Sequence, residues 1–374
     1  MKQVQAGLAV TGDGGIPVFS RVYDGGAWEV AQVVGAMSAL EAMAGRRDFL
    51  LVADSKLVLV LPNITALINA EVTFVAPAPA AKIPDTLYAG LDPATAQFVD
   101  YTADRDTGKA PDQREVYRVL EDAHALAGPR KSDPVIELRR VLVHSSGNAA
   151  GQRSARDKRL HKAAEELEKV RAGAGGRYYN TPDKIAARIG VITTTRRVAT
   201  CLRTTIATDP DGKPTLHWHF DQDILAAEAA ADGWYALLTN LPEAINAEQV
   251  FLRYKGQSVV ERRYSEFKGP LAVTPIFLQH NRRIQALINV ICLALLVYCL
   301  IERQVRQALE SEQTMRGLYP DNRAVRPTGH LILYHLATLT LRPGTATDPP
   351  TILISRGIQT HLLELLGIDE TRPR

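Results

Sequence analysis

Cysteine, net charge and long apolar runs are all scarce in this sequence. Three cysteines among 374 residues are too few for a disulfide framework of the kind that stabilises small secreted proteins. Cys292 and Cys299 lie at helical spacing inside an apolar segment, and we expect them to be buried as small hydrophobic residues. This cysteine usage is typical of a reducing compartment, so we expect a cytoplasmic protein.

The most hydrophobic segment, residues 286–301, is shorter than the roughly 17–25 residues that cross a lipid bilayer. It also contains Asn289, a polar residue that a membrane span disfavours. We therefore predict a buried helix in a water-soluble core and no membrane partner. The alternative is a membrane protein built on this segment, which solubility without detergent would exclude.

Basic residues are concentrated in two stretches, although the formal net charge is only +3. Residues 151–200 hold twelve Lys and Arg against five Asp and Glu, and residues 250–283 hold seven against two. A local basic excess attracts the phosphate backbone of nucleic acids. We predict that Arg153 and Arg156, in a charged helix over 152–172, contact DNA. The alternative is a surface helix stabilised by its own salt bridges.

Alternation of β-prone runs with helical apolar periods predicts an α/β protein over residues 1–76. The strands are expected to form a mixed sheet flanked by helices. The expected elements are a hairpin over 3–23 with a Gly12–Gly15 turn, a helix over 29–45, a strand over 49–54, a helix over 64–69 and a strand over 72–75.

From Pro77 the composition becomes proline-rich and then polar, which indicates a large α+β insertion over 77–231. Its expected elements are a helix over 113–127, a strand over 135–143, the charged helix, and strands over 198–207 and 215–220. The α/β pattern resumes at residue 232. There we expect a strand over 234–240, helices over 247–268 and 280–311, and tail helices over 328–338 and 357–366.

A row of polar side chains is predicted on the helix over 247–268. Tyr254, Glu261 and Lys268 are spaced by seven residues, nearly two helical turns, and Gln257 lies beside their stripe. A carboxylate can bind Mg²⁺, whereas a phenol, an amide and an ammonium group can bind phosphate oxygens. The alternative is an exposed polar stripe with no ligand.

The run YKGQSVVERRYSEFK resembles the Y-x2-R-x3-E-x6-K signature of DDE insertion-sequence transposases, which have the ribonuclease H-like fold. Tyr254, Glu261 and Lys268 fall on the tyrosine, the catalytic glutamate and the lysine of that pattern. Gln257 stands where the pattern has arginine, which weakens the expected grip on phosphate. The run LLVADS is similar to the family's strand before the second catalytic aspartate, which Asp54 would match. The alternative for Asp54 is a cap on the next helix.

The resemblance implies a ribonuclease H-like mixed sheet, interrupted by the insertion and followed by a helical tail. It also implies DNA transposition, in which carboxylates hold two Mg²⁺ or Mn²⁺ ions for in-line displacement at phosphorus. Asp54 and Glu261 would be the catalytic, metal-binding residues. The implied domains are 1–76 and 232–311 for the two parts of the catalytic core, 77–231 for the insertion and 312–374 for the tail.

The family's first catalytic aspartate lies on a strand before the hairpin, and this chain opens at the hairpin. We therefore expect a truncated transposase with an incomplete two-ion site and little or no strand-transfer activity. The alternative is a non-catalytic DNA-binding or dimerising fragment that regulates the full-length enzyme. The expected partners are DNA, as transposon ends and target, and a second copy within the DNA complex. Trp218 is expected to stack on a flipped base, unless it packs in the core.

Overall fold

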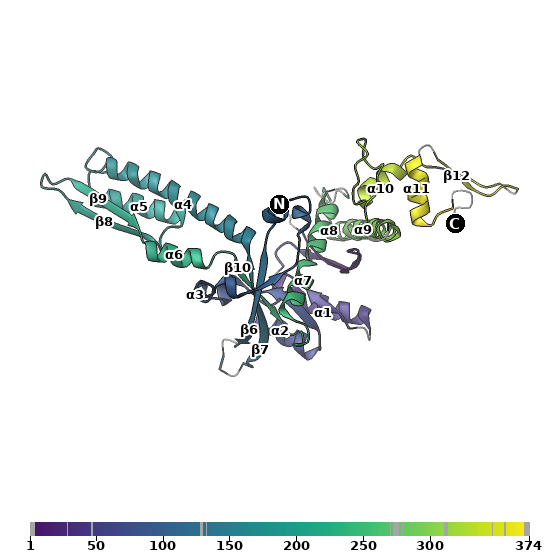
Figure 1. Ribbon diagram of the computed structural model, residues 1–374, viewed down its shortest axis with the longest axis horizontal. Coiled ribbons are helices and arrows are strands. Elements are labelled where there is room, and N and C mark those ends of the chain that lie inside the picture. The colour runs from purple at the N-terminus through teal and green to yellow at the C-terminus, as the bar shows by residue number, and fades with distance from the viewer. Residues whose placement is uncertain are drawn as a thin grey trace. The chain divides into compact units, whose positions relative to one another are not determined.

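The computed structural model describes residues 4–27, 29–45, 48–127, 130–131, 133–269, 271, 277–278, 280–309, 313–345, 347–354 and 357–369. The chain divides into two compact units. The terminal unit consists of residues 1–47 and 255–374, and the central unit consists of residues 48–254. Both contain helices and strands, so the protein is of the mixed α/β class that the sequence predicts (Figure 1).

The central unit is built on a six-stranded mixed sheet with the spatial order β3-β4-β10-β7-β6-β5. The strands β3 and β4 are parallel and are connected through the helix α2, whereas every other pair is antiparallel. The bounds are Leu50–Val52 (β3), Leu61–Asn69 (α2), Thr73–Pro77 (β4), Asp85–Ala89 (α3), Gln97–Val99 (β5), Tyr117–Leu126 (β6), Ile136–Ser145 (β7), Trp234–Thr239 (β10) and Ala247–Lys255 (α7).

Both faces of this sheet are covered. Along β7, Val141 and Val143 belong to the cluster that packs against Phe251 of α7, whereas Leu142 between them packs with Trp234 in a cluster on the other face. Successive side chains of a strand point to opposite faces, so a strand buried on both sides needs a continuous apolar run. The sequence of β10 and the Val141–Val143 part of β7 meet this requirement.

The prediction of a helix over 113–127 is wrong, because the strand β6 occupies most of this range. Tyr117 and Val119 are buried on one face of β6, and the strand pairs with β7 along its whole length. The segment 77–231 therefore supplies β5, β6 and β7 to the same sheet as β3, β4 and β10. The compact units consequently do not follow the domain boundaries that the sequence suggested.

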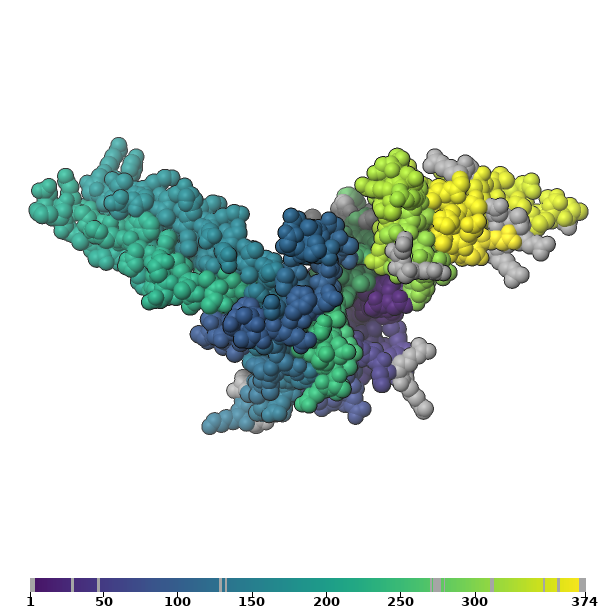
Figure 2. Space-filling model, in the orientation of Figure 1, coloured from purple at the N-terminus to yellow at the C-terminus, as the bar shows by residue number. Residues whose placement is uncertain are grey.

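An arm with a core of its own extends from the end of β7 (Figures 1 and 2). Its first helix begins after Ser145, whose side chain accepts a hydrogen bond from the backbone of Asn148 at 3.0 Å. The charged helix and the two strands predicted here are confirmed, and α5 is an additional helix. The elements are Ser146–Ala172 (α4), Pro182–Arg196 (α5), Leu202–Thr208 (β8), Pro214–Phe220 (β9) and Gln222–Ala230 (α6).

The terminal unit contains the predicted hairpin, the helix that follows it and both predicted tail helices. Among the described residues, β1 and β2 pair only with each other, so the hairpin forms a two-stranded sheet. The bounds are Val4–Val10 (β1), Pro17–Asp24 (β2), Glu29–Ala44 (α1), Ser258–Lys268 (α8), Asn281–Ala308 (α9), Gly329–Leu336 (α10), Thr340–Arg342 (β11), Thr351–Leu353 (β12) and Gly357–Leu366 (α11).

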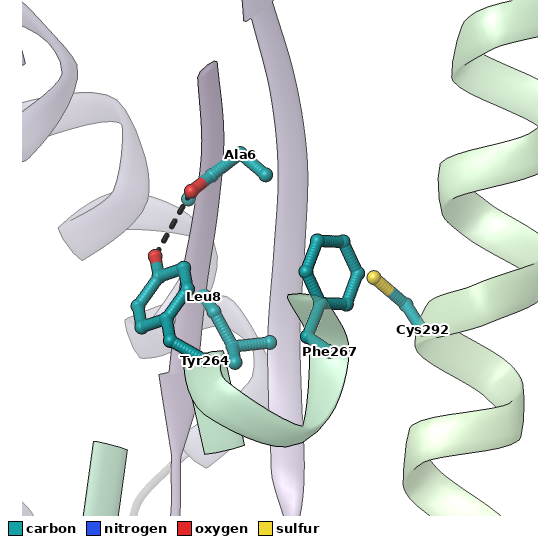
Figure 3. Close-up of a pocket in the computed structure, with 6 residues that line it drawn as sticks. Ala6, Leu8, Tyr264, Phe267 and Cys292 are labelled. Carbon is teal, nitrogen blue, oxygen red and sulfur yellow. Dashed lines mark hydrogen bonds between the residues drawn. The ribbon is translucent and has the colours of Figure 1, made fainter. Parts of the chain in front are cut away.

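The helix α8 fastens the hairpin to α9. Tyr264 donates a hydrogen bond from its hydroxyl to the Ala6 carbonyl at 2.9 Å, and Phe267 packs with Cys292 of α9 (Figure 3). The space between these side chains is too small for a water molecule. This contact is therefore a packed core. The expected burial of Cys292 and Cys299 is confirmed.

The single helix predicted over 247–268 is in fact two helices. The helix α7 ends at Lys255, α8 begins at Ser258, and Gly256 and Gln257 form a turn between them. The boundary between the two units also falls here, between Tyr254 and Lys255. Tyr254 is therefore not on the same helix as Glu261 and Lys268, and the predicted single stripe does not form.

The long helix α9 was predicted to be buried, and this is correct for one of its faces only. The buried face packs against β1, β2 and α8, whereas only 33% of its most apolar 18-residue window is buried. By length and composition, α9 is the one helix in the described part of the chain that could cross a bilayer. The core helix of a soluble protein also passes this test, so the finding is consistent with a soluble protein.

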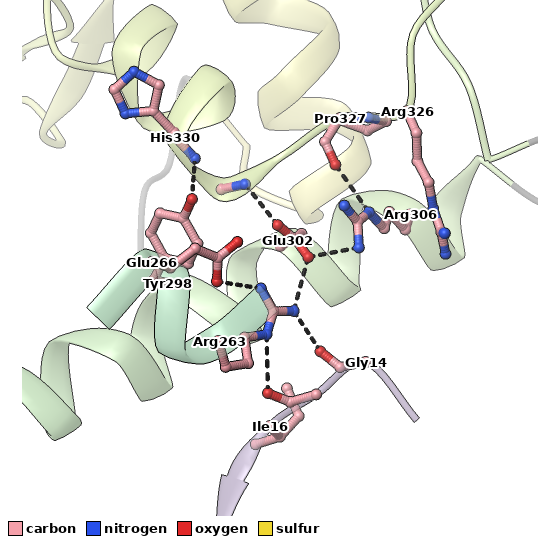
Figure 4. A network of polar contacts seen from close by, with 12 residues as sticks. Gly14, Ile16, Arg263, Glu266, Tyr298, Glu302, Arg306, Arg326, Pro327 and His330 are labelled. Atoms are coloured by element: carbon pink, nitrogen blue, oxygen red, sulfur yellow. Dashed lines mark hydrogen bonds and ion pairs between the residues drawn. The ribbon is translucent and has the colours of Figure 1, made fainter. Parts of the chain in front are cut away.

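A buried ion cluster joins the hairpin turn to α8, α9 and α10 (Figure 4). Arg263 donates hydrogen bonds to Glu266 at 2.6 Å, to Glu302 at 2.8 Å and to the carbonyls of Gly14 at 2.7 Å and Gly15 at 3.1 Å. Burial lowers the pKa of Arg263, but its hydrogen bonds to Glu302 and Glu266 outweigh this effect, so the pKa lies above the ordinary value. The guanidinium therefore stays charged at every ordinary pH.

Glu302 holds a second arginine and the start of α10 at the same time. It forms an ion pair with Arg306 and accepts a hydrogen bond from the Gly329 backbone at 2.9 Å. Burial lowers the pKa of Arg306 to about 10, still well above neutrality. A Cβ at Gly15 would lie 2.5 Å from Val259, and the φ of Gly15 is +64°, so only glycine fits this turn.

We predict that Glu302→Ala destabilises the terminal unit by about 3–5 kcal/mol, because it leaves Arg263 and Arg306 buried with an uncompensated charge. Urea unfolding followed by circular dichroism would measure the loss. The control is Glu261→Ala, which removes an exposed carboxylate and should change stability by less than about 0.5 kcal/mol. Equal stability of the two variants would contradict the role assigned to the cluster.

Candidate functional site

Asp54 lies in the central unit, two residues after the end of β3, and its side chain is exposed. Its Oδ1 accepts a hydrogen bond from the Lys56 backbone at 2.9 Å, and its carbonyl accepts one from Leu57 at 3.2 Å. The next helix, α2, has Val60 at its N-cap position with no side-chain cap. The helix-capping alternative for Asp54 is therefore excluded, and the residue stabilises a turn at the carboxyl end of a parallel strand pair.

Glu261 and Lys268 lie in the terminal unit, in the first and last turns of α8, and both are exposed. Glu261 has no hydrogen bond or ion pair with any described residue, and the positive end of the helix favours its negative charge. The Lys268 ammonium lies 5.8 Å from the ring centroid of Tyr264, which leaves it accessible to solvent. α8 therefore carries an available carboxylate and an available ammonium group.

Tyr254 and Gln257 do not lie on the helix that carries Glu261 and Lys268. Tyr254 lies on α7 in the central unit, where its ring packs against Tyr235 with the centroids 6.4 Å apart. Gln257 occupies the N-cap position of α8 but makes no side-chain cap there. Of the four residues expected on one helical stripe, only Glu261 and Lys268 share a helix.

Asp54 and Glu261 each have the chemistry of a metal ligand. An exposed carboxylate with open lone pairs suits Mg²⁺, which prefers oxygen ligands and keeps several of its waters. The two residues belong to different units, so the structure establishes no common site for them. Within the described ranges, no group of three or more His, Cys, Asp or Glu side chains could hold a metal ion.

The two arginines of α4 that were predicted to bind DNA have different surroundings. Arg153 is exposed and makes no contact with another described side chain. Arg156 forms two hydrogen bonds to Asp232, at 2.9 and 2.7 Å, and both side chains are nearly buried. Arg156 therefore fastens α4 to Asp232, two residues before β10, and its guanidinium is already paired with a carboxylate.

Trp218 packs inside the arm, which is the core alternative considered from the sequence. Its ring lies against Phe220, with the centroids 5.4 Å apart, and both belong to the arm's hydrophobic core. The opposite face of the hairpin exposes His217 and His219. The Trp218 side chain is half-buried, so this packing favours the core alternative, and stacking on a flipped base stays a prediction.

The ion cluster around Arg263 was not predicted from the sequence. One signal was present: Glu302 and Arg306 continue the buried phase of α9 set by Leu295 and Cys299. Charged residues are almost never fully buried without partners, so their phase indicated a buried ion pair. Nothing in the local sequence identified Arg263 as their partner, because exposed basic residues are equally common in such helices.

No protein-family model matches the chain, and a search of curated proteins finds no significant match either.

The contact between α4 and α5 gives a pH-dependent prediction. Glu166 accepts hydrogen bonds from Arg196 at 2.8 Å and from Arg188 at 3.1 Å. The hydrogen bond from Arg196 is the main reason why the pKa of Glu166 lies below the ordinary carboxyl value. A lowered carboxyl pKa stabilises the fold above the ordinary value of about 4.3 and stops doing so as the pH falls through the lowered pKa.

Glu166→Gln should therefore destabilise the arm at pH 7, by no more than about 1 kcal/mol because the pair is partly exposed. The difference from the unmodified chain should vanish as the pH falls below about 4. Urea unfolding at several pH values measures it. Glu165→Gln, which changes an exposed neighbour, serves as the control. A difference that persists at low pH would contradict the assignment.

Proposed function

We propose that this chain is a DNA transposase of the DDE insertion-sequence group, with a ribonuclease H-like catalytic core in which Asp54 and Glu261 bind divalent metal. The proposal is supported chiefly by the setting of these two residues: each is exposed, and each follows or begins a regular element that fixes its position. The motif around Glu261 and the strand before Asp54 supply the resemblance on which the activity rests.

In the proposed reaction, divalent ions would activate a water or a DNA 3′-hydroxyl and stabilise the leaving oxygen at phosphorus. Asp54 would supply a carboxylate from the end of β3, where the turn at Lys56 holds its backbone. Glu261 would supply the second carboxylate from the first turn of α8. Lys268 would pair with a phosphate at the DNA end.

DNA binding is proposed for the exposed face of α4. Lys158 and Lys162 lie four residues apart on the side of the helix opposite the buried residues Ala163 and Leu167. Like Arg153, neither has a partner among the described side chains. Three cations without internal partners on one helix attract a polyanion more strongly than the same charges neutralised by carboxylates.

A second candidate is a DNA-binding or dimerising fragment without catalysis, acting on a full-length transposase. The observation in its favour is the lack of any three-carboxylate group within the described ranges. A gel assay with duplex DNA and Mg²⁺ separates the two candidates. Metal-dependent cleavage favours the transposase, and DNA binding without cleavage favours the fragment.

A double-mutant cycle tests whether Asp54 and Glu261 bind the same metal ions. With duplex DNA present, Asp54→Asn and Glu261→Gln should each weaken Mn²⁺ binding at least about tenfold, because each removes a charged ligand. If both residues bind the same ions, the double variant should lose little more than either single variant. Isothermal titration calorimetry measures the affinities. The control is Glu243→Gln, an exposed carboxylate of the central unit. Additive losses, or none, would refute a shared metal site.

The DNA-binding prediction concerns salt dependence. Replacing Lys158 and Lys162 by Gln should weaken duplex binding and lower the slope of log K against log salt by about 0.9 for each lost phosphate contact. Fluorescence anisotropy over a salt series measures both. Lys131→Gln, an exposed cation in the loop at the other end of β7, is the matched control. If the slope of log K against log salt does not change, DNA does not contact Lys158 and Lys162 on α4.

A further inference from the structure

The helix α9 presents an apolar stripe to solvent. Val290, Leu293, Val297 and Leu300 are 61%, 63%, 56% and 47% exposed. All four lie opposite the face that packs on the hairpin. Isolated exposed hydrophobic residues are normal, but a continuous row of this kind marks an interaction surface.

The stripe continues into a groove. A cavity of about 340 Å³ lies between β2 and α9, and its lining is mainly apolar, with Ser20 and Asn289 as the polar members beside Pro17, Val18, Phe19, Cys292, Leu293 and Leu296. Val18 is itself 39% exposed. The groove lies wholly within the terminal unit, so the apolar surface extends from the helix onto the neighbouring strand.

The spacing of the stripe identifies the kind of occupant that fits. Val290, Leu293, Val297 and Leu300 are separated by three, four and three residues, the spacing by which helices interlock in a coiled coil. A helix with the same spacing is the complementary partner, and α9 of another copy provides one. We propose that α9 is a self-association surface through which two copies of this chain form a symmetric dimer.

The charges at the two ends of α9 favour an antiparallel arrangement. Arg282 and Arg283 are exposed in the first turn and have no partner among the described residues, although the helix dipole there is positive. At the other end, Arg303 is neutralised by Asp13, and Arg306 by Glu302. An antiparallel pair places each unpartnered Arg282 beside the negative end of the partner helix. A parallel pair places the two arginines against each other.

The length of the stripe is sufficient for a dimer. From Arg282 to Gln304 the exposed face extends over about 33 Å of helix axis. Together with Val18 of β2, a contact of this length buries roughly 600–800 Å² per copy, the range between weak and standard interfaces. The dimer does not depend on the proposed transposase function, because its contacts involve residues of the terminal unit alone.

A lipid surface is the competing occupant and is less well matched. Asn289 lies beside Leu293 on the exposed face, and Gln304 and Gln307 continue the stripe at its C-terminal end. A polar residue in an apolar seam is common between helices, where it fixes their register. On a membrane-facing surface, a polar side chain such as that of Asn289 would face lipid without a hydrogen-bond partner.

Sedimentation equilibrium of the full chain tests the proposal. The unmodified protein should be dimeric at micromolar concentrations, and Leu293→Lys combined with Val297→Lys should weaken the dimer at least about 100-fold, because it buries charges at the seam. The matched control is Val191→Lys on α5, where a valine that is 53% exposed is changed away from the stripe. All of these side chains are exposed, so circular dichroism should show unchanged folding.

Cysteine cross-linking tests the orientation and does not depend on the charged variants. In an antiparallel coiled coil, position 290 of one copy lies opposite position 300 of the other. A mixture of Val290→Cys and Leu300→Cys chains should therefore form a disulfide dimer, whereas each alone should not. The native cysteines are buried, and burial raises the pKa of Cys299 to about 12, which keeps its thiol unreactive.

Four results would overturn the proposal: a monomer at about 100 µM; a dimer that both lysines leave intact; no cross-link in the mixture; or a monomer that binds vesicles of equal parts phosphatidylcholine and phosphatidylglycerol through Leu293. The last result would reassign the stripe to a membrane surface. A self-linked Val290→Cys dimer would refute the antiparallel arrangement.

Discussion

A single buried guanidinium, that of Arg263, connects four segments of the terminal unit. It binds the carbonyls of the hairpin turn and the carboxylates of Glu266 and Glu302, and Glu302 in turn holds α10. Removing two charges from water costs several kcal/mol each, so such a cluster is stable only when every member is present. The hairpin, which has no other strand to pair with among the described residues, depends on this cluster and on the packing beneath it.

Features fixed by neighbouring residues could be predicted from the sequence. The turn around Gly14 specified the hairpin, and the apolar periods specified α1 and the tail helices. The strand β6 was mistaken for a helix because EDAHAL has good helix formers. The strand conformation is decided by Tyr117, which packs against Phe251, and by pairing with β7, neither of which is local in sequence.

In the candidate site, too, features set by neighbouring residues were predictable, whereas features set by distant contacts were not. Asp54 follows a strand, as predicted, because a short apolar run before an acid is a local signal. The break at Gly256 could not be seen, since the helical period continues across it from Tyr254 to Glu261. Composition likewise could not show that only one face of α9 is covered. A residue such as Leu293 is equally apolar whether it packs inside the chain or against a partner.

The terminal unit is assembled from two segments that lie far apart in the sequence, because residues 1–47 need residues 255–374 to complete their core. During synthesis the hairpin leaves the ribosome before its packing partners α8 and α9, which follow only after the entire central unit. At ordinary elongation rates this delay is roughly ten to forty seconds. Throughout that interval the nascent hairpin exposes two unpaired strand edges and an apolar face, a form that chaperones bind and that aggregates readily.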